Sequence, residues 1–409
     1  MPSDAAPSTS ARERALLTAR LASYYTAHFF VTGVHLPFWP VWLRSRGLDE
    51  DEIGLALGIG FWTSIVASPG IGRLADRAPD PRRVMTVLGV LSTALFAAFT
   101  LAHGFWACAV LTLAVFAVFS PMLPLAESAT QARVRRGEVH YGRARLWGSL
   151  SFLLTSIGAG RLLDGGSPDW VLWLVIGGSA LCLVATRVLP DVPPREGARA
   201  SLRTVLGLRA FVLCVALAAL VQGSHSVMYG FGTLYWQRLG ISETWIGVLW
   251  AEGVIAEIAL FWVGSRVTAR LGAARLLLLG AAAATVRWIG LALIEEPWAL
   301  LAVQLLHALS FGATHLAGME IVRRSLPAPM LATGQGLYTS IASVSYAIGM
   351  TGAGALFARF EGGAFFVAAA SSGVATLVIA IAGRRWVARA EADALALSTG
   401  PGDGRARAE

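Results

Sequence analysis

One arginine lies inside a stretch of sequence that is otherwise apolar enough to cross a lipid bilayer. The stretch runs from Ala281 to Ile294, and Arg287 is its only charged residue. A guanidinium group keeps its proton in proteins, and at the centre of a membrane helix it costs about 2.5 kcal/mol or more. Arg287 therefore indicates both a membrane location and a polar interior. Its alternative role is a purely structural ion pair.

The composition of the whole chain favours a membrane protein built of helices. Hydrophobic residues make up 56% of the 409 residues, and charged residues make up only 14%, whereas soluble domains carry about 25% charged residues. The apolar runs are continuous and about 20 residues long, which is the length of a membrane helix. Strands of a membrane barrel would alternate between apolar and polar residues instead. We therefore expect an all-α membrane protein.

The apolar runs predict twelve transmembrane helices, six on each side of a polar linker. The linker contains Pro190-Asp-Val-Pro-Pro-Arg-Glu-Gly-Ala-Arg-Ala-Ser201, whose proline and charge content is typical of a connection. A basic loop that opens with glycine recurs at the same place in each half, at Gly72 and at Gly264. This repetition indicates two related six-helix bundles.

The expected boundaries follow from the same runs. The predicted parts are a cytoplasmic N-terminal tail (1–20), a first bundle (21–189), a cytoplasmic linker (190–208), a second bundle (209–386) and a disordered C-terminal tail (387–409). The predicted spans are 21–43, 52–72, 84–102, 105–128, 145–163, 169–189, 209–236, 244–264, 275–294, 298–320, 332–357 and 363–386.

The distribution of the 33 basic residues, all of them arginine, predicts the orientation. With both termini in the cytoplasm, 27 arginines fall on the cytoplasmic side and 5 on the other. Cytoplasmic loops of membrane proteins carry the excess of basic residues, so we expect an N-in/C-in protein of the bacterial plasma (inner) membrane. Because the net charge of +8 is spread over many short loops, no nucleic acid is expected as a partner.

Several classes of function are disfavoured by what the sequence lacks. The three cysteines, Cys108, Cys182 and Cys214, lie in apolar runs without a CxxC spacing, so no disulfide or metal site is expected. No HExxH, GxSxG or P-loop motif occurs, and the absence of lysine excludes lysine-based chemistry. We expect no enzymatic activity, no metal and no cofactor. No cleaved signal peptide is expected, because the first apolar run is too long.

Short motifs along the chain carry a resemblance to a known family. They are Gly72-Arg-Leu-Ala-Asp-Arg77, Phe38-Trp-Pro-Val-Trp-Leu43, Tyr141-Gly-Arg-Ala-Arg-Leu-Trp-Gly148, Gln222-Gly-Ser-His225 and Thr285-Val-Arg-Trp-Ile-Gly290. With the six-plus-six pattern, they resemble the major facilitator superfamily, although Pro79 replaces a usual glycine in the first motif. Within it the chain resembles the lactose permease and related proton-linked sugar and nucleoside symporters. It is most similar to the bacterial 3-phenylpropionic acid permeases.

The resemblance implies roles for individual residues. Glu127 and Arg145 stand at the positions of the pair that binds sugar in the lactose permease, and Phe152 at that of the stacking aromatic residue. Arg287 and His307 match the arginine and histidine of the proton-coupling network. The position of its essential carboxylate is occupied by Ser310, so another group must take that role. A cytoplasmic gate is implied for Gly72, Asp76 and Arg77.

Ionisable residues within the predicted spans add further candidates. A rise of 1.5 Å per residue places Arg287, Glu252 and His307 at similar depth, with Glu257 and His315 a turn or two deeper. A positive charge nearby favours the ionised form of a carboxyl group, so moving Arg287 away would raise the proton affinity of its partner. Histidine also titrates near neutral pH. We predict proton coupling by Glu257, Glu252, His307 and His315, and substrate binding by Glu127, Arg145, Phe152, His225 and Arg287.

These observations predict a proton-coupled importer of a small organic solute that works by alternating access. Arg145 and Arg287 suit a planar carboxylate and neighbouring aromatic residues suit a ring, so an aromatic acid such as phenylpropionate is expected. The alternatives are a proton-coupled sugar or nucleoside symporter and an efflux antiporter, since the fold does not decide the function. The expected partners are the substrate, protons and the lipid bilayer, and the expected functional unit is a monomer.

Overall fold

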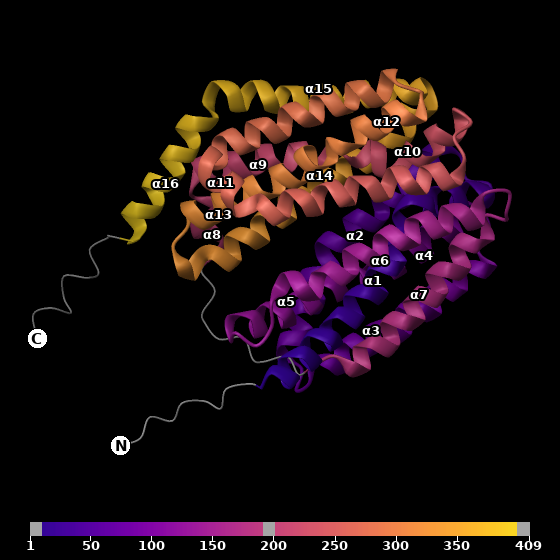
Figure 1. The fold of residues 1–409 in the computed structure, drawn as a ribbon, viewed down its shortest axis with the longest axis horizontal. Coiled ribbons are helices and arrows are strands. Elements are labelled where there is room, and N and C mark those ends of the chain that lie inside the picture. The colour runs from indigo at the N-terminus through magenta and orange to yellow at the C-terminus, as the bar shows by residue number, and fades with distance from the viewer. Residues whose placement is uncertain (1–9, 191–200, 399–409) are drawn as a thin grey trace, which may run out of the picture. The chain divides into compact units, whose positions relative to one another are not determined.

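The computed structural model describes residues 10–190 and 201–398, and every regular element in those ranges is a helix (Figure 1). The expectation of an all-α protein is confirmed. The helices before the gap are α1 (Ala11–Ser45), α2 (Glu50–Arg77), α3 (Pro81–Ala98), η1 (Phe99–Leu101), α4 (Gly104–Phe119), α5 (Met122–Arg135), α6 (Tyr141–Leu163) and α7 (Asp169–Val188). Those after it are α8 (Leu202–Leu206), α9 (Arg209–Gly223), α10 (Ser226–Arg238), α11 (Glu243–Leu293), α12 (Pro297–Leu305), η2 (Ala308–Ala313), α13 (Thr314–Ser325), η3 (Ala328–Met330), α14 (Leu331–Phe360), η4 (Glu361–Gly363), α15 (Ala364–Val378), η5 (Ile379–Gly383) and α16 (Arg384–Ser398).

Among the described residues, nine helices or runs of helices are long and apolar enough to cross a membrane. Two of these runs, Glu243–Leu293 and Ala328–Leu397, have 51 and 70 residues, whereas one crossing needs about 20. Helix α1 is not one of the nine. Each of the twelve ranges expected from the sequence overlaps a helix, while the number of crossings and their orientation stay predictions.

Local sequence explains where individual helices begin and bend. At the start of α3, the Asp80 side chain accepts a hydrogen bond from the backbone N–H of Arg82, and Pro81 occupies the first helical position,. The same arginine side chain lowers the pKa of the Asp80 carboxyl group. Within α11, Gly272 has φ of 70° and ψ of 163°, a conformation that glycine adopts without strain. The kink falls between the eighth and ninth predicted spans.

The chain divides into two compact units. Unit 1 consists of Met1–Leu48, Thr63–Arg195 and Ser242–Ala251, and unit 2 consists of Asp49–Trp62, Glu196–Ile241 and Glu252–Glu409. Two helices therefore contribute to both units, because α2 gives its first turns to unit 2 and α11 gives its first turns to unit 1. Most of each predicted bundle lies in one unit, but the two exchanged segments were not predicted.

Unit 1 is organised around α1, which packs against both α6 and α7 (Figure 1). A Cβ atom at Gly33 of α1 would lie 2.8 Å from the carbonyl oxygen of Phe152 on α6, so the glycine allows a close helix contact. Ser156 of α6 donates a hydrogen bond of 2.9 Å to the carbonyl oxygen of Gly33. The first turns of α11 are joined to this unit by Thr244, which donates to Asp164 at 2.7 Å.

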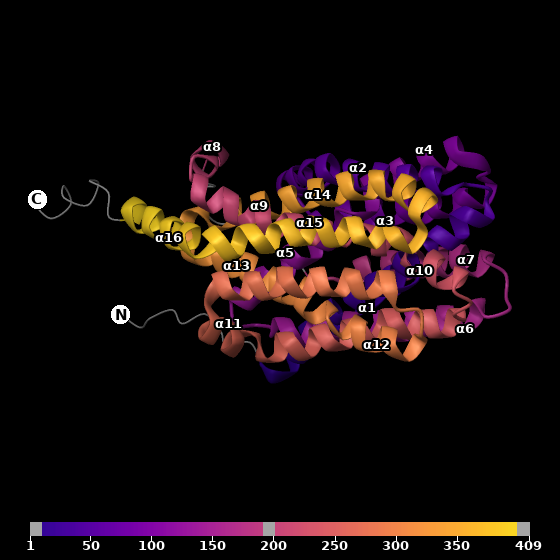
Figure 2. The ribbon, with the colours of Figure 1, turned by 90° about the horizontal axis from the view of Figure 1, so that it is seen from above.

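Unit 2 is organised around α9, which packs against α13, α14, α15 and α16. Helix α16 continues from the end of α15 (Figure 2) and buries Val387, Ala390 and Ala394, whose spacing places them on one face. Residues 387–398 are therefore helical, which corrects the prediction of a disordered tail from 387; residues 399–409 lie outside the described part. The predicted linker 190–208 contains the short helix α8, and its residues 191–200 are outside the description as well.

The first turns of α2 are held in unit 2 by close backbone contact and by ion pairs. A Cβ atom at Gly54 would lie 2.7 Å from the backbone nitrogen of Gly354 on α14, so the two helices meet at a pair of glycines. Arg238, the last residue of α10, pairs with Glu50 at 2.6 Å and with Glu361 at 2.8 Å. Exposed or partly exposed pairs contribute about 0–1 kcal/mol each, so the glycine contact is the stricter constraint.

We expect Gly354→Ala to destabilise the protein by roughly 1–3 kcal/mol, the usual cost of overpacking. The new methyl group would lie 3.0 Å from the Cα atom of Asp51 and closer still to the carbonyl oxygen of Glu50. The measurement is the midpoint of unfolding in a denaturing detergent titration. Gly352→Ala on the same helix is the control, because its Cβ has open space. Equal midpoints for the two variants would contradict the close contact between α2 and α14.

Candidate functional site

Arg287 is the centre of a buried polar cluster in unit 2. Its side chain is 2% exposed, and its guanidinium carbon lies 4.7 Å from the centre of the neighbouring Trp288 ring. Nε and Nη2 both donate to Oε1 of Gln304, at 3.2 and 2.9 Å. Nη1 donates to Nδ1 of His307 at 3.1 Å and to Oγ of Ser310 at 3.2 Å. Within the described part of the chain, no carboxylate forms an ion pair with this guanidinium.

A π-helical turn presents two of these partners together. The run from Pro297 to Ser325 is α-helical in α12, π-helical in η2 and α-helical again in α13. His307 stands directly before η2 and Ser310 within it, and both reach the same Nη1 atom. The ring of Phe311 stacks on His307 with centroids 5.2 Å apart. Such π-turns are rare and frequently occur at functional sites.

The hydrogen bonds assign the tautomer of His307. A guanidinium nitrogen can only donate, so Nδ1 of His307 must accept from Arg287, and the ring proton of the neutral imidazole is on Nε2. Nε2 lies 3.6 Å from Oε2 of Glu257. A protonated His307 would present an N–H at Nδ1 to the guanidinium donor. His307 therefore stays neutral for as long as Arg287 keeps this position.

The opposite tautomer is assigned to His225, which is fully buried. Its Nδ1 lies 3.2 and 3.1 Å from the carbonyl oxygens of Val221 and Gln222, and because carbonyls only accept, Nδ1 must donate. Nε2 then accepts from the hydroxyl group of Ser310, at 3.3 Å. Ser310 thus links His225 to Arg287 at the position where the resemblance led us to look for a carboxylate.

The three remaining coupling candidates differ in their surroundings. Glu257 faces His307, with its Oε2 atom 3.6 Å from Nε2 of the ring. Glu252, five residues earlier on α11, interacts electrostatically with Arg287, and neither of its buried carboxyl oxygens has a hydrogen-bond partner among the described residues. His315 stacks on Phe311 at 6.4 Å, and no hydrogen bond in the described ranges joins it to Arg287. The expected carboxylate partner of Arg287 is thus replaced by the amide oxygen of Gln304.

A column of aromatic rings stands beside this cluster in unit 2. The rings of Tyr229 and Tyr346 are nearly parallel, with centroids 5.9 Å apart and an angle of 14°. Phe61, from the first turns of α2, also stacks on Tyr346, with centroids 5.7 Å apart. Tyr229 also lies 5.8 Å from the ring of His225. All three members of the column are partly exposed, so they offer flat apolar surface to a ring.

Unit 1 holds a second, separate cluster around Arg145. Nε of Arg145 on α6 lies 3.5 Å from Oε1 of Glu127 on α5, and the hydroxyl group of Tyr141 donates to the same oxygen at 3.2 Å. The guanidinium carbon lies 3.8 Å from the centre of the Phe29 ring, a cation–π contact. Nη1 of Arg145 is buried without a hydrogen-bond partner among the described residues, so this cluster leaves one charged donor unsatisfied.

The other residues singled out in the sequence are placed as follows. Phe152 is 5% exposed and packs at the contact of α6 with α1, and the ring that Arg145 covers is that of Phe29. The gate residues Gly72, Asp76 and Arg77 lie in the last two turns of α2, and the two charged side chains are exposed.

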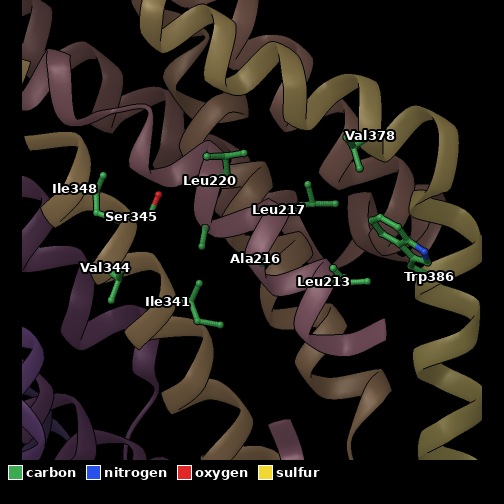
Figure 3. A pocket seen from close by; sticks show the side chains of 11 residues that line it. Leu213, Ala216, Leu217, Leu220, Ile341, Val344, Ser345, Ile348, Val378 and Trp386 are labelled. Carbon is green, nitrogen blue, oxygen red and sulfur yellow. The ribbon is translucent and has the colours of Figure 1, made fainter. Parts of the chain in front are cut away.

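One hollow in unit 2 lies away from this chemistry. It measures about 390 Å³ and is bordered by α9, α14 and the chain from α15 to α16 (Figure 3). Its lining is aliphatic except for Ser345 and Trp386. With no ionisable group in its wall, it is not the candidate site, and the buried cluster around Arg287 is.

Sequence reasoning missed Gln304 and the π-turn. Gln304 is the single strongly polar residue in the run Ala299–Leu306, and a lone amide in a membrane helix needs a partner. That signal was available, but it does not say which charged group the amide binds. The sequence around η2 has no proline to mark the change of helix type.

The comparisons with known proteins agree with the fold and with the motifs. The model of the family described as "MFS_1 like family" matches residues 18–368. The probable 3-phenylpropionic acid transporter of Escherichia coli (strain K12) is 34% identical over 365 residues, which cover 86% of this chain and 94% of that protein. The maltose permease of Geobacillus stearothermophilus is 26% identical over 345 residues, which cover 83% and 85%. The crystal structure of the nucleoside transporter NupG superposes with a TM-score of 0.76 at 16% identity, covering 89% and 98%, which shows a shared fold.

We expect Gln304→Leu to destabilise the protein by roughly 1.5–3 kcal/mol, because Nε and Nη2 of Arg287 would remain buried without an acceptor. The midpoint of unfolding in a denaturing detergent titration measures this effect. Gln335→Leu, at an exposed glutamine of α14, is the matched control. The double variant Arg287→Met with Gln304→Leu should recover part of the loss, since both partners are then removed. If the effects of the two substitutions on stability are strictly additive, the two side chains do not interact.

Proposed function

Since this chain belongs to the MFS_1 like family of membrane transporters, we propose that it imports a small aromatic carboxylate together with protons. We place it in a bacterial inner membrane with both termini in the cytoplasm, working by alternating access. The 27 arginines that this orientation puts on the cytoplasmic side support it,.

The observation that carries the proposal is the neutral surroundings of Arg287. A buried charge is costly unless an opposite charge accompanies it, yet the hydrogen-bonding partners of this guanidinium are an amide, an imidazole and a hydroxyl group. Gln304 holds one edge of the guanidinium, while His307 and Ser310 hold Nη1. An anionic substrate that displaced the two weaker acceptors at Nη1 would supply the missing negative charge. Carboxylates match guanidinium geometry well.

The rings of Tyr229, Tyr346 and Phe61 support an aromatic substrate. Parallel rings 5.7–5.9 Å apart offer flat faces on which a further ring stacks favourably. For Arg145 of unit 1, whose Nη1 atom has no hydrogen-bond partner among the described residues, we propose a substrate contact separately. The relative from Escherichia coli is a probable transporter of 3-phenylpropionic acid, a molecule with one ring and one carboxylate.

Proton coupling is assigned to His307 and Glu257. A substrate carboxylate that took the place of His307 at Nη1 of Arg287 would free Nδ1 of the imidazole. That nitrogen could then bind a proton, and the positive ring would be held by Glu257 at Nε2, now 3.6 Å away. Substrate and proton would therefore bind together, which is the requirement for symport. Glu252, with two unpartnered buried oxygens, is the alternative proton-binding group.

We expect labelled 3-phenylpropionate to accumulate in proteoliposomes that carry an inward proton gradient. The neutral analogue 3-phenylpropionamide, a galactoside and a nucleoside should not accumulate, because none brings a negative charge to Arg287. An ionophore that collapses the gradient, and the variant Arg287→Gln, should each remove the accumulation. Passive entry of the protonated acid is subtracted with empty liposomes, and Arg359→Gln, at an exposed arginine, controls for loss of charge.

If the nucleoside or the galactoside accumulates and the acid does not, the proposed substrate class is wrong. Acid uptake that survives the ionophore would contradict proton coupling. Export of the acid from preloaded vesicles against an opposite proton gradient, without uptake in the first assay, would indicate antiport.

We expect Glu257→Gln to reduce gradient-driven accumulation more than about tenfold. Exchange of labelled for unlabelled substrate should stay intact. The amide keeps a hydrogen-bond acceptor for His307 but has no charge to hold a protonated ring. The assay compares net accumulation with exchange in the same proteoliposomes. Glu296→Gln, at an exposed glutamate, is the control. If accumulation persists in Glu257→Gln and is lost in Glu252→Gln, the coupling group is Glu252.

A further inference from the structure

A second hollow in unit 2 carries two guanidinium groups that the transport chemistry does not use. It measures about 170 Å³ and lies between α11 and the chain that runs from η5 into α16. Its lining residues are Ala274, Arg275, Leu278, Ile379, Ala380 and Arg384. At about 30 Å³ per water molecule, the space is large enough for a phosphate group with its ester oxygens.

The two arginines face this hollow without a counter-charge. Neither Arg275 nor Arg384 forms an ion pair with any described residue, although other arginines of unit 2 do so. Arg324, for example, pairs with Glu320 and lies 3.7 Å from Glu391. Both side chains are exposed, and an anion in the hollow would give each guanidinium group an opposite charge.

A second π-turn contributes to the arrangement. Ile379 and Ala380 belong to the π-helical η5, and Arg384 is the residue that follows it. The opposite wall comes from the segment of α11 that resumes after the kink at Gly272. Two separate breaks in regular α-helix thus border the same hollow. Such π-turns are rare and frequently lie at functional sites.

The surroundings of the hollow specify the chemistry of its occupant. Arg275 opens the predicted ninth span and Arg384 lies near the end of the predicted twelfth, so both stand where a membrane helix meets the lipid headgroups. Guanidinium groups suit phosphate, and basic pockets between transmembrane helices bind anionic headgroups. The side chains of Leu278, Ile379 and Ala380 continue the wall with aliphatic surface.

We propose that this hollow is a binding site for one anionic phospholipid. The phosphodiester group is held between Arg275 and Arg384, and the first carbons of an acyl chain lie against Leu278 and Ile379. The larger hollow of Figure 3 differs in this respect, because its lining residues include no charged group and therefore cannot select a headgroup.

The test is native mass spectrometry of the purified full-length chain, equilibrated with equal amounts of phosphatidylglycerol and phosphatidylcholine. We expect one phosphatidylglycerol to be retained in preference to phosphatidylcholine. Because two charge-assisted hydrogen-bonding groups are removed, Arg275→Gln with Arg384→Gln should weaken this retention at least about tenfold. Arg266→Gln with Arg270→Gln is the matched control, since it removes the same charge from exposed positions of α11 outside the hollow.

Equal retention of phosphatidylglycerol by the wild-type chain and by the Arg275/Arg384 double variant would overturn the proposal. An equal loss in the Arg266/Arg270 control would also overturn it, because general basic charge would then explain the binding. If the double variant does not fold, Arg275→Gln and Arg384→Gln are measured singly, and each should lose part of the preference. If inorganic phosphate stabilises the protein in phosphatidylcholine as much as phosphatidylglycerol stabilises it, the hollow binds a free anion and not a lipid.

Discussion

The structure of unit 2 depends on the way in which a permanently charged guanidinium group is accommodated out of water. Arg287 cannot discharge itself, so the protein must provide acceptors for its N–H groups. Gln304 provides them at one edge, and the π-turn η2 delivers His307 and Ser310 to the other. The same bonds decide which nitrogen of His307 carries its proton. Among the described residues, an amide, an imidazole and a hydroxyl group thus accept the hydrogen bonds of one buried cation.

The sequence is enough to find two residues of this cluster but not the hydrogen bonds that join them. Arg287 and His307 stand out because each is an ionisable residue in an apolar run, and helical rise alone places them at the same depth. Their direct contact agrees with that depth. Among the described residues, the group that accepts hydrogen bonds from Nε and Nη2 of Arg287 is the amide of Gln304 and not the expected carboxylate. Glu257, on α11, lies within 3.6 Å of the His307 ring, a contact between two helices that the sequence pattern alone does not reveal.

Other differences have equally local causes. A disordered tail was expected where α16 forms, because the charged residues of 384–393 hid the small apolar face that packs on unit 2. Phe152 was chosen by resemblance, whereas the structure buries it and places Phe29 against Arg145. The family determines the general architecture of helices, and a solved nucleoside transporter with 16% identity shares it.

The two helices shared between the units have a consequence for movement. The chain passes from one unit to the other within α2, between Trp62 and Thr63, and within α11, between Ala251 and Glu252. A continuous helix is stiff along its axis, so a displacement of either unit must be absorbed by bending or shearing at these two points. In α11 the boundary between the units is next to Glu252 and five residues before Glu257. A bend of the helix at this boundary would therefore change the surroundings of both carboxyl groups.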